Sequence, residues 1–231
     1  MNEKEPVKTK SNEDFLEGLQ RKETGRVVLM YSGGVDCTAA GLLLREQGLD
    51  VFPLFVDYGQ SSSEAERVLV ENVPVRLGFR PAHIVETDIM KQLTKSKLLG
   101  QEALSDDDAW VPGRNTLFMV IAGIYAKQID GDGIAIGYML DDNFVFGDND
   151  YFHHKGIEQV LSHSFLQPMQ VFLPTRSMTK RELIQKLTNA GFIDLTVSCW
   201  NAKVEKNKII SCHECANCLE REKGINELKK E

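Results

Sequence analysis

The stretch Val27-Val28-Leu29-Met30-Tyr31-Ser32-Gly33-Gly34-Val35-Asp36-Cys37-Thr38 decides the fold class of this chain. Its apolar first part, residues 27–31, predicts a buried strand, and the apolar residues of 38–47 before Gly48 predict a helix. Glycines between a strand and a helix let backbone N–H groups approach phosphate oxygens, and the helix start adds free donors and partial positive charge. We therefore expect an anion-binding loop at residues 32–38.

The alternation of strand and helix continues along the chain. It predicts further strands at 50–56, 83–87, 133–138 and 170–173, and further helices at 64–77, 116–128, 156–165 and 179–190. Residues 91–113 and 141–150 are polar and are expected to be loops. This rhythm predicts an α/β fold, a parallel twisted sheet with helices on both faces, in which ligands bind beyond the carboxyl ends of the strands.

Composition excludes several function classes. The chain has 231 residues, is 42% hydrophobic and carries a formal net charge of -7, which argues against a protein that grips bulk nucleic acid. No apolar run is long enough to span a membrane, and residues 1–23 lack the apolar core of a signal peptide. A cytoplasmic protein without stable nucleic-acid binding is expected.

Three segments are expected along the chain. Residues 1–25 form a leader with a short helix near 11–19, and residues 26–195 form the α/β domain that carries the loop. Residues 196–231 form a cysteine module and a charged tail.

The loop chemistry differs from that of kinases and GTPases, because the lysine of their phosphate loop is missing. The hydroxyls of Ser32 and Thr38 add donors, and Asp36 is expected to orient the loop or to hold Mg²⁺. Lys180, at the start of a predicted helix after Pro174, is a candidate second phosphate ligand.

Four of the five cysteines cluster near the C-terminus, at Cys199, Cys212, Cys215 and Cys218. In a chain without an export signal, this spacing predicts a metal site rather than disulfides. Zn²⁺ fits four thiolates in a closed tetrahedral site, and an iron–sulfur cluster is the chemical alternative. His213 is expected to be a bystander, and Cys37 belongs to the loop.

With both motifs placed, the chain resembles the 7-cyano-7-deazaguanine synthase family of the ATP pyrophosphatase superfamily. The resemblance spans residues 27–226 and rests on these motifs: Ser32-Gly33-Gly34-Val35-Asp36-Cys37-Thr38, Val56-Asp57-Tyr58-Gly59-Gln60, Val111-Pro112-Gly113-Arg114-Asn115, Ile136-Gly137, Lys180, Ser198-Cys199-Trp200 and the three closing cysteines. It implies a Rossmann-like fold of the adenine nucleotide α-hydrolase type with a small C-terminal zinc module.

The resemblance also implies an ATP-dependent C–N ligase of queuosine biosynthesis. A carboxylate on a 7-deazaguanine base attacks ATP, ammonia displaces AMP to give an amide, and a second ATP converts the amide to a nitrile. ATP, Mg²⁺ and Zn²⁺ are the implied cofactors, and a homodimer is expected.

The resemblance assigns residues to four roles. The catalytic residues are expected to be Asp36, Arg114 and Lys180. Those that bind ATP are Tyr31, Ser32, Gly33, Gly34, Val35, Asp36, Cys37, Thr38, Asp57 and Gly137. Those that bind the base are Gln60, Arg114, Asn115, Asp142 and Asp148, and the metal ligands are Cys199, Cys212, Cys215 and Cys218.

The chain departs from the family pattern in two places. The family's Arg-His after Tyr-Gly-Gln is replaced by Ser61-Ser62-Ser63, and its Tyr-Pro-Asp-Cys is replaced by an acidic stretch in which Asp148 or Asp150 can take over the aspartate. These departures leave three alternatives open: transfer of the acyl group to another amine, for example on a protein partner in an antiviral system; adenylation of RNA; and a non-enzymatic scaffold.

Overall fold

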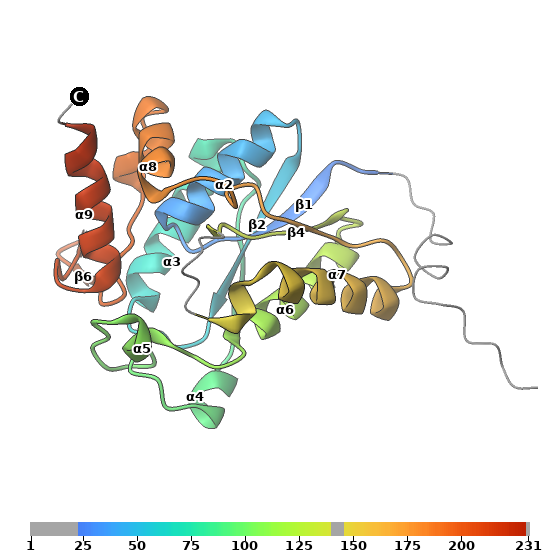
Figure 1. Cartoon of the computed structure of the whole chain (residues 1–231), viewed down its shortest axis with the longest axis horizontal. Coiled ribbons are helices and arrows are strands. Elements are labelled where there is room, and N and C mark those ends of the chain that lie inside the picture. Colours follow the sequence, from blue (N-terminus) through green and yellow to red (C-terminus); the bar gives the residue numbers. More distant parts are fainter. Residues whose placement is uncertain (1–22, 140–145, 230–231) are drawn as a thin grey trace, which may run out of the picture.

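The structure is a computed structural model, and it describes residues 23–139 and 146–229. The leader helix expected near 11–19 and the expected base-binding residue Asp142 lie outside this range. The described residues form a five-stranded parallel sheet in the order β3-β2-β1-β4-β5 (Figure 1). Its strands are β1 (Arg26–Met30), β2 (Asp50–Asp57), β3 (His83–Glu86), β4 (Gly133–Ala135) and β5 (Gln170–Phe172). The predicted parallel α/β fold is confirmed.

Helices cover both faces of the sheet. Alternate side chains of β1 point to opposite faces, so each face contributes to its own part of the core. Val27 and Leu29 pack in the core on the side of α2 (Val35–Glu46) and α8 (Lys180–Asn189), and Val28 packs on the side of α6 (Arg114–Gln128) and α7 (Tyr151–Phe165). The main helices are α2 (Val35–Glu46), α3 (Ser63–Asn72), α6 (Arg114–Gln128), α7 (Tyr151–Phe165), α8 (Lys180–Asn189) and α9 (Ala216–Leu228), and the short ones are α4 (Ile89–Leu93) and α5 (Asp106–Ala109).

The strand order places a crevice at the carboxyl edge of the sheet. Val28 of β1 pairs with Phe52 of β2 on one side and with Ile134 of β4 on the other. The chain therefore runs outward in one direction from β1 to β2 and β3, and later in the other direction through β4 and β5. A reversal of this kind separates the loops that follow the two central strands and is where ligands bind in such sheets.

Two helix boundaries differ from the prediction for local reasons. Helix α7 begins at Tyr151 rather than at 156, because the Asp150 carboxylate caps it by accepting a hydrogen bond from the His153 amide at 2.6 Å. Helix α3 ends at Asn72 rather than 77, because the chain turns there and Pro74 opens a separate 3-10 turn. The segment 91–113, expected to be a loop, also contains the short helix α5.

The C-terminal segment has more structure than a charged tail. It contains a hairpin of β6 (Lys203–Glu205) and β7 (Lys208–Ile210), followed by helix α9. A Cβ on Gly224 would come within 2.5 Å of Ile184 Cδ1, so this glycine lets α9 approach α8 closely. Figure 1 shows α8 and α9 next to each other at one end of the molecule. The domain boundary at 195/196 stays a prediction.

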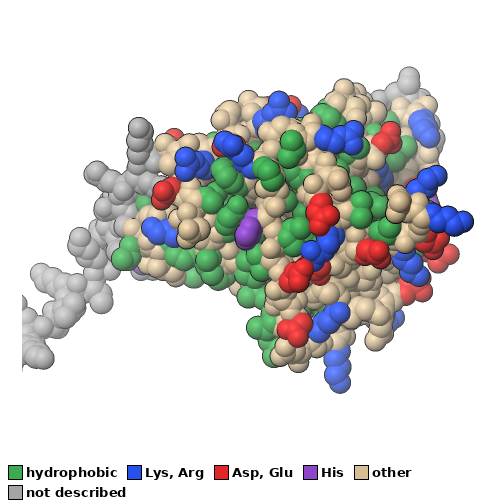
Figure 2. All heavy atoms as spheres, turned by 180° about the vertical axis from the view of Figure 1, so that it is seen from behind, with side chains coloured by type: hydrophobic (Ala, Val, Ile, Leu, Met, Phe, Trp, Pro, Cys, Tyr) green, Lys and Arg blue, Asp and Glu red, His purple; other side chains and the backbone are tan. Residues whose placement is uncertain are grey.

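The surface agrees with the acidic composition. Figure 2 shows charged side chains of both signs interspersed with apolar ones on the face turned away in Figure 1, with no extended basic stripe among the described residues in view. None of the helices in the described part of the chain has the length and apolar character that crossing a membrane requires.

Candidate active site

The loop between β1 and α2 leaves the start of a helix open to a ligand. Gly34 is the N-cap of α2, and no side chain caps the helix there. The first N–H groups of α2 thus keep their capacity to bind an anion. Gly33 has a φ of +81°, and a Cβ on it would meet Leu69 Cβ at 2.7 Å, so only glycine fits this turn.

The end of β4 packs directly on this helix start. A Cβ on Gly137 would lie 2.6 Å from the backbone of Asp36 and Cys37, which explains a glycine two residues beyond the end of β4 at Ala135. The Cys37 thiol is buried and donates a hydrogen bond to the Gly34 carbonyl at 3.3 Å. Burial raises the pKa of Cys37, which disfavours its thiolate form.

Asp36 and Lys180 form an ion pair at the mouth of the loop. The Lys180 ammonium donates to both carboxylate oxygens of Asp36, at 2.7 and 2.8 Å, and lies 3.1 Å from Glu220. Lys180 is the first residue of α8, whose start is held by a capping box between Thr179 and Glu182. Although burial alone would lower the pKa of Lys180, the nearby Asp36 and Glu220 carboxylates raise it, so the lysine is charged at neutral pH.

A cleft of about 310 Å³ opens in front of this pair. Most of the predicted ATP-loop, catalytic and base-binding residues line it, together with one of the four C-terminal cysteines: Tyr31, Ser32, Gly34, Val35, Asp36, Cys37, Gln60, Arg114, Asn115, Gly137, Lys180 and Cys199. Residues from six separate parts of the sequence thus share one cavity at the carboxyl edge of the sheet.

The wall that α3 and α6 contribute is rich in polar groups. Arg114, the first residue of α6, donates to the Tyr58 hydroxyl at 3.3 Å, and its guanidinium lies 6.0 Å from the centre of that ring. Gln60 donates from Nε2 to Glu66 Oε2 at 2.6 Å, and Ser62 donates from Oγ to Glu66 Oε1 at 2.9 Å. The wall therefore presents a cation and a carboxylate to the same cavity.

Of the predicted ATP- and base-binding residues within the described part of the chain, four do not line the cleft, namely Gly33, Thr38, Asp57 and Asp148. Asp57 accepts hydrogen bonds from Ser63 at 2.6 Å and Arg67 at 2.7 Å. Burial alone would raise the pKa of Asp57, but these donors hold it below its usual value. Asp148 accepts from the Asn115 amide at 3.2 Å and so caps the start of α6. Their predicted roles toward ligands stay predictions.

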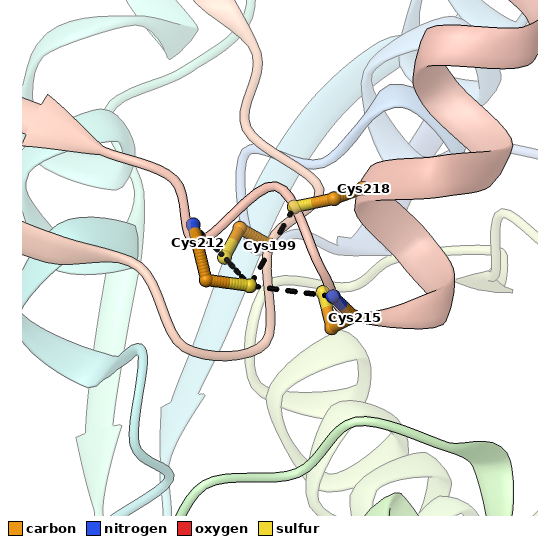
Figure 3. A group of neighbouring side chains, drawn as sticks. All are labelled: Cys199, Cys212, Cys215 and Cys218. Carbon is orange, nitrogen blue, oxygen red and sulfur yellow. Dashed lines mark hydrogen bonds between the residues drawn. The ribbon is translucent and has the colours of Figure 1, made fainter.

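The four C-terminal cysteines converge on one point (Figure 3). All four sulfur atoms lie within 4.8 Å of one another, and the Cys199–Cys212 and Cys212–Cys218 pairs are 3.5 and 4.0 Å apart. Zn–S bonds of about 2.3 Å in a tetrahedron place sulfur atoms about 3.8 Å apart. The donor set and its spacing fit a single tetrahedral metal ion.

The surroundings favour a thiolate at one of the four cysteines, whereas burial raises the pKa of Cys199 and Cys218. Burial alone would raise the pKa of Cys212, but backbone N–H groups of Glu214 and Cys215 lower it to about 6, which favours a thiolate at neutral pH. His213 is exposed and its Nδ1 lies 2.6 Å from Glu222, away from the sulfur cluster. The cluster therefore consists of the four predicted cysteines without the histidine.

The cysteine module forms part of the cleft wall. Cys199 lines the cleft together with its neighbours Ser198 and Trp200. The amide of Asn201 exchanges two hydrogen bonds with the backbone of Ala103, at 2.7 and 3.0 Å, and so ties the module to the segment 91–113. A metal held by the four cysteines would thus fix the position of this wall.

Sequence reasoning missed one carboxylate that lines the cleft and one that pairs with Lys180 beside it. Glu66 was not singled out, although an acidic residue in the first turn of the helix after Gly59-Gln60 was a usable signal. Glu220, the second partner of Lys180, lies on the helix that was expected to be a charged tail.

Comparison with protein families gives one match over nearly the whole chain. The model for "Queuosine biosynthesis protein QueC" matches residues 26–229. The chain is 28% identical to the 7-cyano-7-deazaguanine synthase of Pyrococcus furiosus, covering 87% of this chain and 92% of the relative. It is 27% identical to the enzyme of the same name from Saccharophagus degradans, covering 89% of this chain and 95% of the relative.

Two solved structures share the fold. The U34-tRNA thiolase NcsA from Methanococcus maripaludis, with its [4Fe-4S] cluster, aligns with a TM-score of 0.52 at 16% identity over 95% of this chain and 71% of its own. A 4-thiouridine synthetase in complex with RNA and ATP aligns with a TM-score of 0.51 at 17% identity, over 89% of this chain and 51% of its own. At these identities the likeness is one of fold alone.

Proposed function

This chain belongs to the QueC family, and on that premise we propose that it activates a carboxylate on a 7-deazaguanine base with ATP and converts it with ammonia to an amide and then a nitrile. As a member of this family it is an ATP-dependent C–N ligase similar to 7-cyano-7-deazaguanine synthase. The observation that carries the proposal is that an uncapped helix start, Lys180 and Arg114 all line the same cleft.

The first step is adenylation. The loop from Ser32 to Thr38 and Lys180 hold the pyrophosphate of ATP, and a carboxylate oxygen of the base attacks the α-phosphorus. The bond from phosphorus to the pyrophosphate oxygen breaks, and an acyl-adenylate remains. Positive groups around the phosphates stabilise the charge that moves onto the leaving pyrophosphate. Arg114 offers a fixed guanidinium fork for the carboxylate or the α-phosphate.

The later steps reuse the same groups. Ammonia adds to the acyl carbon, AMP leaves with the bridging oxygen, and the amide forms. A second ATP is attacked by the amide oxygen, and loss of AMP and two protons yields the nitrile. Mg²⁺ would neutralise phosphate charge when it binds with ATP, and Asp36 is the loop carboxylate available to it.

We assign the remaining roles as predicted from the sequence. Tyr31, Asp57 and Gly137 join the loop in binding ATP, and Gln60, Asn115, Asp142 and Asp148 join Arg114 in binding the base. Support comes from the positions of Tyr31, Gln60, Asn115 and Gly137 in the cleft wall.

We propose that the four cysteines hold Zn²⁺ as a structural ion. Support comes from sulfur atoms no more than 4.8 Å apart, because a cluster of four irons and four sulfides is bulkier and would hold the thiolates further from one another. Elemental analysis of the purified chain tests this. Zinc near one ion per chain supports it, and iron with acid-labile sulfide contradicts it.

The alternative acceptor is an amine on a protein partner. The replacement of the family's Arg-His by Ser61 and Ser62, of which Ser62 lines the cleft, supports a different acceptor. Incubation of the chain with ATP, the base and a candidate partner tests it by intact-protein mass spectrometry. A base adduct on the partner supports the alternative, and free amide or nitrile alone contradicts it.

We also propose a homodimer, supported by large apolar side chains that stay exposed on α6 and α7, namely Ile124, Phe152 and Val160. Light scattering coupled to size exclusion measures the mass, and a mass of one chain at micromolar concentration would exclude the dimer.

The function itself is tested with purified chain, ATP, 7-carboxy-7-deazaguanine and ammonium. We expect AMP, pyrophosphate and the nitrile base, and no AMP when the base is omitted. Formation of ADP, or an unchanged base mass, would refute the proposal.

A further inference from the structure

We propose that the carboxylate of Glu66 recognises the base by accepting two hydrogen bonds from its guanine-type edge, the ring N–H and the adjacent exocyclic amine. This inference rests on the proposed function and adds the residue that selects the base.

The side chain of Glu66 is held firmly in the cleft wall. Glu66 lies in the first turn of α3, lines the cleft and is half-buried. One of its oxygens accepts from Gln60 Nε2 at 2.6 Å and the other from Ser62 Oγ at 2.9 Å. Gln60 is fixed in turn, because its Oε1 accepts from the Tyr58 amide at 3.0 Å. The carboxylate thus has one orientation before any ligand enters.

The carboxylate keeps unused acceptor capacity. An ionised carboxylate has about four acceptor positions, and two of them are occupied by Gln60 and Ser62. The positive charge of Arg114 acts on Glu66 and favours its ionised form. Burial raises the pKa of Glu66, and two ligand donors would stabilise its ionised form. A partly desolvated anion with free lone pairs attracts a ligand with paired donors.

The edge of a guanine-type base has the complementary pattern. Its ring N–H and exocyclic amine point in the same direction and match the two oxygens of one carboxylate. An adenine-type edge presents a ring acceptor there and is repelled by the anion, and a hypoxanthine-type edge lacks the amine. The carboxylate on the five-membered ring lies at the other end of the base, and Arg114 is a cation that lines the same cleft.

The test compares Glu66→Gln with Glu64→Gln, an exposed residue of the same helix turn. Binding of 7-carboxy-7-deazaguanine and of its analogue without the exocyclic amine is measured by titration calorimetry, without ATP. Base-dependent AMP formation is measured in parallel. Glu66→Asp, which keeps the charge, serves as a second variant, and thermal melting and zinc content report on the fold.

We expect the wild-type chain to bind the natural base about 10- to 100-fold more tightly than the analogue, which is the range for a lost hydrogen bond to a charged group. Glu66→Gln should lose this preference and raise the KM for the base while leaving the KM for ATP within about twofold. Glu64→Gln should behave as wild type. Glu66→Asp should keep part of the preference even if Glu66→Gln folds poorly.

The outcomes separate this inference from the proposed function. Equal affinity of wild type for the two bases, or an unchanged preference in a folded Glu66→Gln, overturns the role of Glu66 while AMP formation can persist. Selective binding without AMP formation refutes the proposed reaction and supports the role of Glu66. If the base neither binds nor reacts, both proposals are wrong.

Discussion

Replacing Asp36 by asparagine should uncouple the ion pair that joins the loop to α8. Lys180 is 12% exposed and donates to both Asp36 oxygens, so Asp36→Asn leaves a nearly buried ammonium with Glu220 as its remaining carboxylate partner among the described residues. Loss of one partner from a fully buried pair costs about 3–5 kcal/mol. Because Asp36 is 34% exposed and Glu220 stays 3.1 Å away, we expect about 1–2 kcal/mol here.

A matched control exists on the same two helices. Glu46 of α2 and Lys186 of α8 form an ion pair at 2.7 Å, but Glu46 is 61% exposed. Glu46→Gln should therefore cost at most about 0.5 kcal/mol and leave AMP formation unchanged.

Urea unfolding followed by circular dichroism measures the free energies of unfolding, and pyrophosphate release measures activity. The double variant with Lys180→Met should recover stability relative to Asp36→Asn, with a coupling energy of about 1–2 kcal/mol. Asp36→Asn should reduce AMP formation at least about 100-fold, because the ammonium is no longer held toward the phosphates. If Asp36→Asn costs no more than Glu46→Gln, or keeps wild-type AMP formation, the assigned role of the pair is wrong.

Three further perturbations test other parts of the account. Cys215→Ser should lose the metal and lower the Tm, since structural metal binding is coupled to folding. The control His213→Ala should keep both the metal and the wild-type Tm. Zinc bound to a folded Cys215→Ser would contradict the ligand set. Burial lowers the pKa of His154 from 6.5 to about 4, so the unfolded chain takes up the proton at a higher pH than the folded chain does. The free energy of unfolding should therefore fall by up to about 3 kcal/mol as the pH drops from 6.5 to about 4. Urea titrations at several pH values measure this fall, and His154→Phe should flatten it. Arg114→Lys should lower kcat about 10²- to 10³-fold while the Tm stays near wild type, and an unchanged kcat would exclude the guanidinium fork from the reaction.

Local chemistry explains what the sequence could predict. The strand, the two glycines and the helix of residues 27–47 are neighbours in the chain, so their pattern predicts both the loop and its place at the sheet edge. The spacing of Cys212, Cys215 and Cys218 allows one turn to wrap an ion, and Cys199 was assigned to them correctly. In both cases, the binding of phosphate or of a metal ion requires a fixed spacing of residues, and the sequence shows that spacing directly.

Tertiary packing decided what the sequence could not predict. Helix α9 buries only a few of its side chains, so its sequence did not predict that it packs on α8. The contact of Gly224 with α8 shows this packing. The Asp148 carboxylate accepts a hydrogen bond from the backbone N–H of Asn115 at the start of α6, which is distant in the sequence. The place of Glu66 in the cleft depends on where α3 begins, and that start follows from the turn at Gly59. Such contacts join segments that no local pattern relates.

The central claim is that this chain cuts ATP at the α-phosphate with a carboxylate oxygen of the base. The most direct measurement supplies 7-carboxy-7-deazaguanine labelled with ¹⁸O in its carboxylate and follows the label by mass spectrometry. Attack by the carboxylate oxygen and later displacement of AMP must leave one labelled oxygen on AMP, so we predict labelled AMP and unlabelled pyrophosphate. Unlabelled AMP, or ADP with phosphate, would contradict the account.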